Sequence, residues 1–476
     1  MSDRPSVARP RPEPLDALIV GGGVAGLALA ALLKRRRPSW TIRILEAQAR
    51  PGGTVGSIRH DGFTTDVGPI GALDDADGVV PLARELGLAP VPAAPEASRR
   101  WVWANGGLRP LPTSPPSFLA SELLGPAAKL RALAEPLVPA ADREESVHAF
   151  LVRRFGYGVA RALAEAAVLG VSGGDPTRLS LDALFPSVRD LERRHGSVLV
   201  GALRKAREAK TRAAATAGAA PRPRLHGFGA EGMQAWVDAL AGDAGEALRT
   251  EASVERLERS PSGTTHVTTA DGARLEARRT ALAVPPHAAA ALVGRALPEV
   301  AAGLAAMRSA PMRVVGLGYH RIDVPHPLDG FGFLIPRDRG VRSLGVLFGS
   351  SLFPGQAPPE HVHLRVLAGG VRDPEAAELS DDAALAFVRR DLRVTLGVDA
   401  APVSLRQVRW ARAIPQAELG HAERVASWRA ALQERLGVTL LGAAYGGIGL
   451  NGAVRDARRV AQAWAPEPAQ EPERSG

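Results

Sequence analysis

The sequence contains no cysteine among its 476 residues. Disulfide bonds, thiolate catalysis and cysteine-ligated zinc or iron–sulfur centres are therefore excluded. Lysine is scarce, with four residues, so arginine supplies most of the formal net charge of +9. That charge directs attention to nucleic acid, anionic lipid or acidic small molecules as partners, although an arginine-rich composition with a solvated surface explains it equally well.

The chain also has little that could cross a membrane or direct secretion. Its one long uncharged run, residues 17–33, is shorter than the roughly 20 residues of a spanning helix, and four glycines interrupt it. Residues 1–14 are rich in proline and arginine and lack the apolar core of a secretory signal. With 45% hydrophobic and 23% charged residues, we expect a cytoplasmic protein of two or three domains.

Residues 16–46 have the pattern of a βαβ unit, with strands at 17–20 and 41–45 and a helix at 24–36. The turn reads Gly21-Gly22-Gly23-Val24-Ala25-Gly26, and Glu46 follows 20 residues later. Such glycines allow a pyrophosphate to approach the helix N-terminus, and the acid can bind a ribose. The unit predicts a dinucleotide site, and both NAD and FAD fit it.

The remaining chain divides by pattern into a mostly helical stretch and a strand-rich stretch. From about 80 to 205 the pattern is helical, apart from a proline-rich interruption at 110–116. Residues 201–224 carry seven basic residues against one glutamate and predict a flexible insertion. Strands are predicted at 253–257, 264–269, 312–320, 331–336, 342–348 and 362–368, with a hairpin turn at Asp271-Gly272.

Further motifs decide between the two cofactors. Arg50-Pro51-Gly52-Gly53-Thr54, Gly62-Phe63 and Asp66-Val67-Gly68-Pro69 are similar to the second glycine motif and the flavin approach of the flavin amine oxidase superfamily. Over about residues 16–463 the chain resembles one branch of it, the protoporphyrinogen oxidases and the related bacterial coproporphyrinogen III oxidases. The motifs that carry this resemblance are Glu145–Gly156, Gly170–Asp175, Leu179-Ser180, Phe185-Pro186, Glu192–Ser197, Gly330–Pro336, Ala413–Gln416 and Leu441–Asn451.

The resemblance implies an α/β plus α+β fold: a Rossmann-type FAD-binding domain assembled from discontinuous segments, a mixed-sheet substrate domain and a helical subdomain. The expected boundaries are 15–95, 225–285 and 406–464 for the FAD-binding domain, 96–200 for the helical subdomain, 201–224 for the basic flexible insertion and 286–405 for the substrate-binding sheet. Residues 1–14 and 465–476 are expected to be disordered tails.

The same resemblance assigns the site residues. The FAD contacts it implies are Gly21, Gly22, Gly23, Val24, Ala25, Gly26, Glu46, Ala47, Arg50, Gly53, Thr54, Gly68, Pro69, Ile70, Gly71, Val254, Trp410, Ile448, Gly449 and Leu450. The substrate contacts it implies are Arg100 for a propionate, Phe331, Leu334 and Leu367 around the ring, and Gly170 and Gly173 for close approach. No protein group is expected to act in catalysis and no metal is expected, since flavin N5 takes the hydride.

The implied reaction is the oxidation of a porphyrinogen to a porphyrin in heme biosynthesis, by three two-electron transfers to FAD, with oxygen as acceptor and hydrogen peroxide released. Protoporphyrinogen IX and coproporphyrinogen III remain equal candidates. No nucleic-acid partner is expected. A homodimer and peripheral membrane contact through residues 110–124 stay open.

Two departures from the family pattern accompany the resemblance: Ile70 replaces an arginine of the eukaryotic members, and Gly446-Gly447 replaces a bulkier or charged pair. The alternatives are another flavin amine oxidase, a carotenoid-type desaturase or a non-catalytic FAD-binding protein. Amine oxidases typically hold a lysine near the flavin and an aromatic cage, whereas here the lysines lie elsewhere and only Tyr445 is near the terminal turn.

Overall fold

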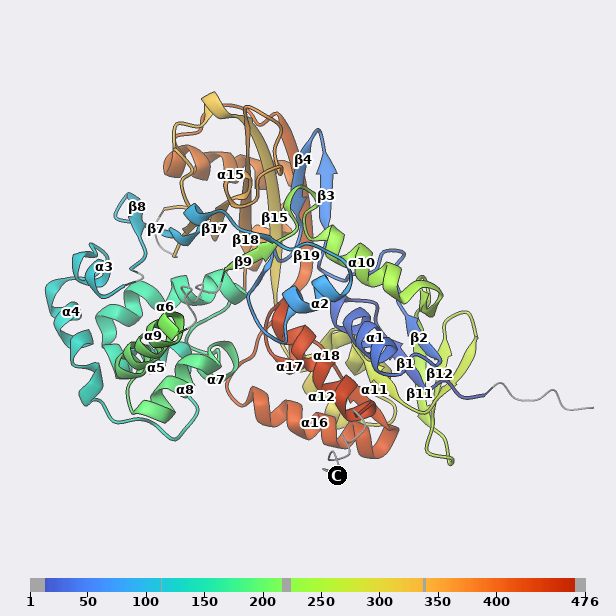
Figure 1. Cartoon of the computed structure of the whole chain (residues 1–476). Helices are drawn as coiled ribbons and strands as arrows, with labels where there is room; N and C mark the ends of the chain where they lie inside the picture. The colour runs from blue at the N-terminus through green and yellow to red at the C-terminus, as the bar shows by residue number, and fades with distance from the viewer. Residues whose placement is uncertain (1–12, 113, 216–223, 337–339, 467–476) are drawn as a thin grey trace, which may run out of the picture.

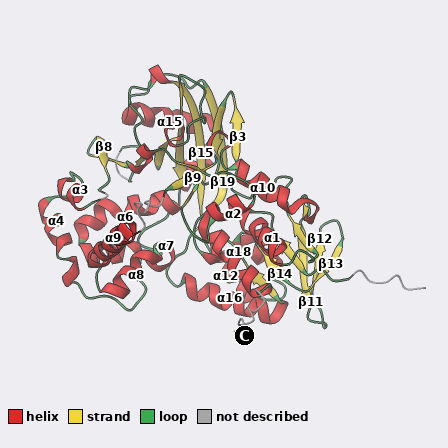
Figure 2. Ribbon diagram, viewed as in Figure 1, coloured by secondary structure: helices red, strands yellow, loops and turns green. Residues whose placement is uncertain are grey.

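The structure is a computed structural model that describes residues 13–112, 114–215, 224–336 and 340–466 (Figure 1). Its helices and strands gather into a part around a parallel sheet, a part around a large mixed sheet and a helical part (Figures 1 and 2). The predicted fold class, a Rossmann-type domain assembled from distant segments plus a mixed sheet and a helical subdomain, is confirmed.

A five-stranded parallel sheet forms the first part, in the order β10-β2-β1-β14-β20. The strands are β1 Ala17–Val20, β2 Ile42–Leu45, β10 Leu248–Arg249, β14 Thr280–Leu282 and β20 Val438–Leu440. The first two come from the predicted βαβ unit. The other three arrive from more than 200 residues further along the chain, so no single segment could form this sheet alone.

Helix α1 (Val24–Arg36) lies at the centre of this part, packed against α10 (Gln234–Ala244) and α18 (Leu450–Trp464). Residues 24–33 are all buried, which explains why this helix is apolar on every side. On the opposite side of the sheet α11 (Pro286–Val293), α12 (Pro298–Ala306) and α16 (His421–Leu436) contribute to a second core. No helix within the described ranges has the length and apolar character needed to cross a bilayer.

A seven-stranded sheet of order β19-β15-β18-β17-β16-β7-β8 forms the second part. The strands are β19 Ser404–Pro415, β15 Ser309–His320, β18 His361–Gly369, β17 Gly345–Phe348, β16 Gly332–Leu334, β7 Trp101–Ala104 and β8 Gly107–Pro110. Helix α15 (Asp381–Leu396) and the core around Phe348 and Leu364 cover one face. The hairpin β3 (Ser57–His60) and β4 (Phe63–Asp66) crosses the other face, where Gly316 and Gly318 leave room for Thr65 and Phe63.

Two predicted boundaries around this sheet are wrong. Residues 101–110 fall in the range predicted as helical, yet they form the β7–β8 hairpin of the large sheet. Asn105 and Gly106, both with positive φ, make the two-residue turn typical of such hairpins. Strand β19, which contains residues 406–415, pairs with β15 rather than with the parallel sheet, because its alternating side chains suit an antiparallel ladder.

The helical part contains α3 to α9. Their bounds are α3 Pro115–Ala120, α4 Pro126–Leu133, α5 Val147–Phe155, α6 Tyr157–Ser172, α7 Leu181–Leu184, α8 Pro186–His195 and α9 Val198–Ala215. Residues 201–215 of the predicted flexible insertion are thus the continuation of a helix, since their alanines and basic residues favour helix formation. Residues 216–223, and the predicted tails 1–12 and 467–476, lie outside the described residues. Ala465, placed in the tail by prediction, is buried in the core.

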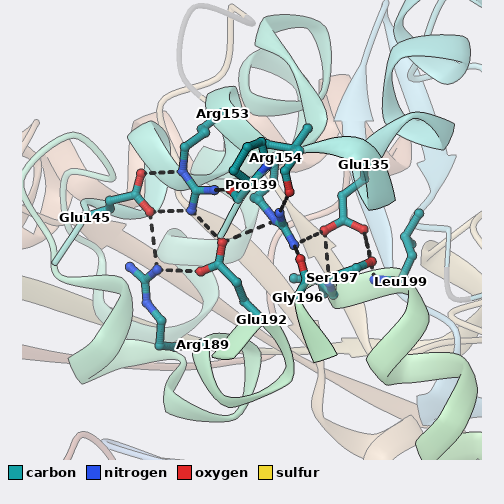
Figure 3. A network of polar contacts seen from close by, with 12 residues as sticks. Glu135, Pro139, Glu145, Arg153, Arg154, Arg189, Glu192, Gly196, Ser197 and Leu199 are labelled. Atoms are coloured by element: carbon teal, nitrogen blue, oxygen red, sulfur yellow. Dashed lines mark hydrogen bonds and ion pairs between the residues drawn. The ribbon is translucent and has the colours of Figure 1, made fainter. Parts of the chain in front are cut away.

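A buried network of ion pairs holds the helical part together (Figure 3). Glu192 on α8 is fully buried and accepts hydrogen bonds from Arg153 at 2.7 Å and Arg189 at 2.5 Å. Arg154 lies between Glu192 and Glu135, at 3.4 Å and 2.6 Å. Burial by itself raises the pKa of Glu145, but Arg153 and Arg189 outweigh it, so this pKa lies below its ordinary value. The charged positions of the helical-domain motifs therefore act as an internal scaffold.

Candidate functional site

The first glycine turn joins β1 to α1. A β-carbon on Gly21, whose φ is +108°, would lie 2.5 Å from the carbonyl oxygen of Ala283, and one on Gly26 would clash with the carbonyl oxygen of Gly21. By contrast, no atom of the described residues lies within 4 Å of a β-carbon built on Gly23. Two of the glycines therefore serve close packing within the protein, whereas Gly23 borders open space at the helix N-terminus.

Glu46, at the end of β2, lies beside this turn. Its Oε2 accepts a hydrogen bond from the Gly22 amide at 2.7 Å, and its Oε1 accepts one from the Gln48 amide at 2.9 Å. Each carboxylate oxygen keeps a further acceptor site. Val254, predicted on the adenine side, begins strand β11 (Val254–Arg259), and the nearby Ala252 amide donates to the Glu46 carbonyl at 2.8 Å.

The second glycine motif packs directly on the first. The Gly52 amide donates to the Gly22 carbonyl at 2.8 Å, and a β-carbon on Gly53 would lie 3.6 Å from the α-carbon of Gly23. Arg50 braces the turn by donating to the carbonyls of Gly53 and Val55, at 2.7 and 2.8 Å. Predicted contacts Thr54 and Ala47 lie at the same surface, half-buried and exposed respectively.

The turn at residues 68–71 connects this surface to the large sheet. Trp410 on β19 donates its Nε1 hydrogen to the Val67 carbonyl at 2.8 Å, and Arg365 on β18 donates to the Gly68 carbonyl. Gly71 has no room for a side chain because the His226 carbonyl lies against it. Of the predicted contacts here, Pro69 is half-buried and Ile70 packs with Phe331 against a small cluster around Phe353.

The glycine-rich turn before α18 forms the fourth wall. Nothing lies within 4 Å of a β-carbon on Gly449, while one on Gly446 would overlap Asp456. Asp456 accepts from the Gly442 amide at 3.0 Å and pairs with Arg429 and Arg459. Ile448 is half-buried and Leu450 is buried. Gly446, a departure from the family pattern, therefore has no room for a side chain, because Asp456 occupies the space beside it.

Asn451 joins this fourth wall to the segment that follows the turn at residues 68–71. Its Oδ1 accepts from the Val79 amide at 3.0 Å and its Nδ2 donates to the Leu73 carbonyl at 2.8 Å. The four turns therefore belong to one connected framework. Open space at Gly23 and Gly449, two helix N-termini and the remaining acceptor sites of Glu46 fit a flavin dinucleotide, so the residues present suit the predicted cofactor.

The predicted substrate contacts fall into two groups. Leu334 and Leu367 pack with Met312 in one apolar cluster; a β-carbon on Gly170 would lie 3.4 Å from Leu334 Cδ1 and one on Gly173 3.2 Å from Met312 Sδ. Phe331 lies instead beside Ile70, with the Arg100 guanidinium 4.9 Å above its ring centroid.

Arg100 is exposed as a residue, but its charged end is partly desolvated. That desolvation lowers the pKa of Arg100 below its ordinary value without neutralising it. Among the residues that the structure describes, no carboxylate pairs with it, whereas neighbouring Arg99 pairs with Asp329. Arg100 is therefore a cation left available for an anionic ligand.

A cavity of about 300 Å³ lies elsewhere, along α5 and α6. Its lining includes His148, Tyr157, Arg161 and Arg372, and Arg372 is already paired with Glu165 and Asp175. None of the predicted site residues lines it.

Three residues that the sequence analysis missed lie at the junction between the turns and the large sheet: Thr65, His363 and Arg365. Thr65 Oγ1 lies 2.9 Å from His363 Nε2, and His363 and Arg365 are 1% and 6% exposed. The alternation His361-Val362-His363-Leu364-Arg365 is a strand signal, but polar residues in such a pattern usually face solvent, so nothing in it showed that this face is covered.

The fold and the four turns define an FAD-binding oxidoreductase of the Rossmann class. Residues 24–464 match the family of flavin-containing amine oxidoreductases, and the chain belongs to this family. Relatives include the chloroplastic protoporphyrinogen oxidase of Nicotiana tabacum, 31% identical over 94% of this chain and 85% of the relative. The coproporphyrinogen III oxidase of Propionibacterium freudenreichii is 31% identical over 93% and 89%.

Solved structures agree on the fold. A protein from Exiguobacterium sp. 255-15 superposes with a TM-score of 0.80 and 23% identity, covering 95% of this chain and 98% of the other. Putrescine oxidase bound to putrescine superposes with a TM-score of 0.67 and 17% identity, covering 95% and 99%. The cofactor follows from the family match: the family is flavin-containing, and the predicted dinucleotide unit makes that flavin FAD.

Proposed function

We propose that this chain is a porphyrinogen oxidase of heme biosynthesis, which removes electrons and protons from a porphyrinogen until the aromatic porphyrin is formed. The observation that carries the proposal is Arg100, a guanidinium without a carboxylate partner among the described residues, held over Phe331. Phe331 lies next to Ile70 of the turn at residues 68–71, here called the flavin-side turn. An apolar ring with carboxylate arms needs this combination. The names of the curated relatives support the same substrate class.

In this proposal the chain binds and orients its substrate rather than reacting with it. Leu334 and Leu367 form an apolar wall against the macrocycle, and Phe331 contacts its edge. Gly170 in α6 and Gly173 directly after it place no side chain against that wall. Arg100 binds a propionate by a charge-assisted hydrogen bond, which fixes which methylene bridge lies towards the cofactor.

FAD would supply the redox chemistry when bound, as the hydride acceptor for three two-electron oxidations, with oxygen as the final acceptor and hydrogen peroxide as its product. The residues proposed to hold it are the predicted contacts in the four turns together with Glu46, Val254 and Trp410.

The test is an assay of the purified FAD-loaded protein with chemically reduced protoporphyrinogen IX and coproporphyrinogen III in parallel. We expect porphyrin fluorescence to rise above the autoxidation blank, with three peroxides released per porphyrin. A preference for one porphyrinogen identifies the step of heme biosynthesis that the chain performs. A flavin-loaded protein that is inert towards both contradicts the proposal, and porphyrin formation without peroxide contradicts oxygen as the acceptor.

A further inference from the structure

Arg365 is a buried cation at the junction between the flavin-side turn and the proposed substrate wall. Its guanidinium donates to the Gly68 carbonyl, and Leu367 follows two residues later on the same face of β18. In register with Arg365, on β17, lies Leu347, which packs in the cluster of Ile70 and Phe331. One side chain therefore touches the turn and adjoins both groups of proposed substrate contacts.

The counter-charge available to Arg365 is Asp66, and that carboxylate is already well bonded. Asp66 Oδ1 accepts from the Met233 amide at 2.8 Å and from Ser57 Oγ at 2.6 Å, and its Oδ2 accepts from Gln356 Nε2 at 3.2 Å. Arg365 Nε is buried without a partner among the described residues. An arginine that is 6% exposed and incompletely bonded lowers the stability of the folded protein. Such an unfavourable buried charge suggests a functional role.

The guanidinium stays charged in this setting. Burial lowers the pKa of Arg365 to about 10, against the attraction of Asp66, so the side chain remains protonated at neutral pH. In surroundings of low polarity a fixed positive charge acts on nearby groups more strongly than it would in water. Two-electron reduction adds negative charge to a flavin, and a preorganised cation stabilises such charge.

We propose that Arg365 is a positioning residue for the cofactor: it holds the turn at 68–71 through the Gly68 carbonyl, and its buried charge favours the reduced flavin. The described lysines lie at the end of α1 and in α4 and α9, so they do not supply such a charge at this turn. The inference rests on the proposed assignment of residues 68–71 to the FAD site, but not on the identity of the substrate.

The experiment compares the FAD-loaded wild type with Arg365→Gln and Arg365→Lys. Gln keeps a donor for the Gly68 carbonyl but no charge, whereas Lys keeps the charge. The matched control is Arg313→Gln, since Arg313 on β15 is also fully buried and lies on the opposite face of the sheet, 2.8 Å from Asp381. The readouts are the flavin midpoint potential, the visible flavin spectrum and the dissociation constant of oxidised FAD, all measured without porphyrinogen.

In R365Q we expect the ratio of the affinity for reduced FAD to the affinity for oxidised FAD to fall about tenfold. For a two-electron couple this lowers the midpoint potential by about 30 mV. R365K should keep most of the wild-type potential, and R313Q should keep all of it. The proposal would be overturned if R365Q kept the wild-type potential and spectrum. It would also be overturned if R313Q shifted the potential as much as R365Q does.

If R365Q loses FAD while melting at the temperature of R313Q, the positioning role is supported, and R365K must then retain FAD; failure of R365K under those conditions overturns it. These readouts separate the inference from the proposed function. If R365Q shows the expected shift in flavin potential but the wild type is inert towards both porphyrinogens, only the proposed function is contradicted.

Discussion

Gly53 packs directly against Gly23: a β-carbon on Gly53 would lie 3.6 Å from the α-carbon of Gly23. They come from different turns, and the hydrogen bond from the Gly52 amide to the Gly22 carbonyl keeps those turns together. Because Gly23 otherwise borders open space, its missing side chain leaves room for a ligand rather than for the protein.

This geometry predicts that two glycine substitutions in one motif affect different properties, FAD affinity in one case and protein stability in the other. Gly23 has φ −70° and ψ 172°, which alanine adopts freely, so Gly23→Ala should leave the melting temperature of the apoprotein unchanged but weaken FAD binding more than about tenfold. Gly26→Ala should instead destabilise the protein by about 3 kcal/mol through overpacking against Gly21. Calorimetry with and without FAD measures both effects, and equal loss of stability in the two variants would refute this distinction.

Arg100 should contribute to substrate affinity because its guanidinium has no carboxylate partner among the described residues. Arg100→Ala removes a cation that no described carboxylate neutralises, so KM for the porphyrinogen should rise about tenfold with little change in kcat. The control is Arg99→Ala, because Arg99 already pairs with Asp329. A KM that responds equally to both substitutions would mean that Arg100 binds no substrate carboxylate.

The buried ion-pair network predicts strong dependence of the helical part on Glu192. Glu192→Gln leaves Arg154 and Arg189 with less counter-charge in a site without water access, which should lower the free energy of unfolding by about 3–5 kcal/mol. Glu231→Gln breaks the exposed pair with Arg59 and should cost less than about 1 kcal/mol. Urea denaturation of the two variants gives both values, and a small effect at Glu192 would contradict the scaffold role.

Two buried histidines predict loss of stability in acid. Burial, with help from Arg365, lowers the pKa of His363 to about 3, and burial and Arg424 lower the pKa of His421 to about 4. The unfolded chain, with histidine pKa near 6.5, then binds more protons than the folded one, so stability falls as the pH drops below about 6.5.

His363→Gln should remove about 2 kcal/mol of the stability difference between pH 7 and pH 5, because Gln keeps a partner for Thr65 but does not titrate in this range. His266→Gln serves as the control for the substitution itself, since 49% of the His266 side chain is exposed. Denaturant titrations at the two pH values provide the comparison; a wild-type slope in H363Q would exclude His363 as a source.

Local patterns determined much of this fold. The bounds of α1 and β1 agree with prediction because an apolar helix that starts at a glycine turn and ends in Lys34, Arg35 and Arg36 carries its own start and stop signals. The hairpin at Asn105-Gly106 carried an equally local signal that the helical interpretation overlooked.

The sequence by itself determined the βαβ unit, its glycine spacing and the FAD-type motifs, since these depend on backbone conformations that each short segment imposes on itself. Only the tertiary structure decided which of many arginines are buried. Arg365, Arg154 and Arg100 look alike along the chain, but Arg365 donates to the Gly68 carbonyl and Arg154 is enclosed between two glutamates. Arg100 has no carboxylate partner among the described residues. A charge is tolerated inside a protein according to the partners that distant segments bring to it, and short-range patterns carry no record of those partners.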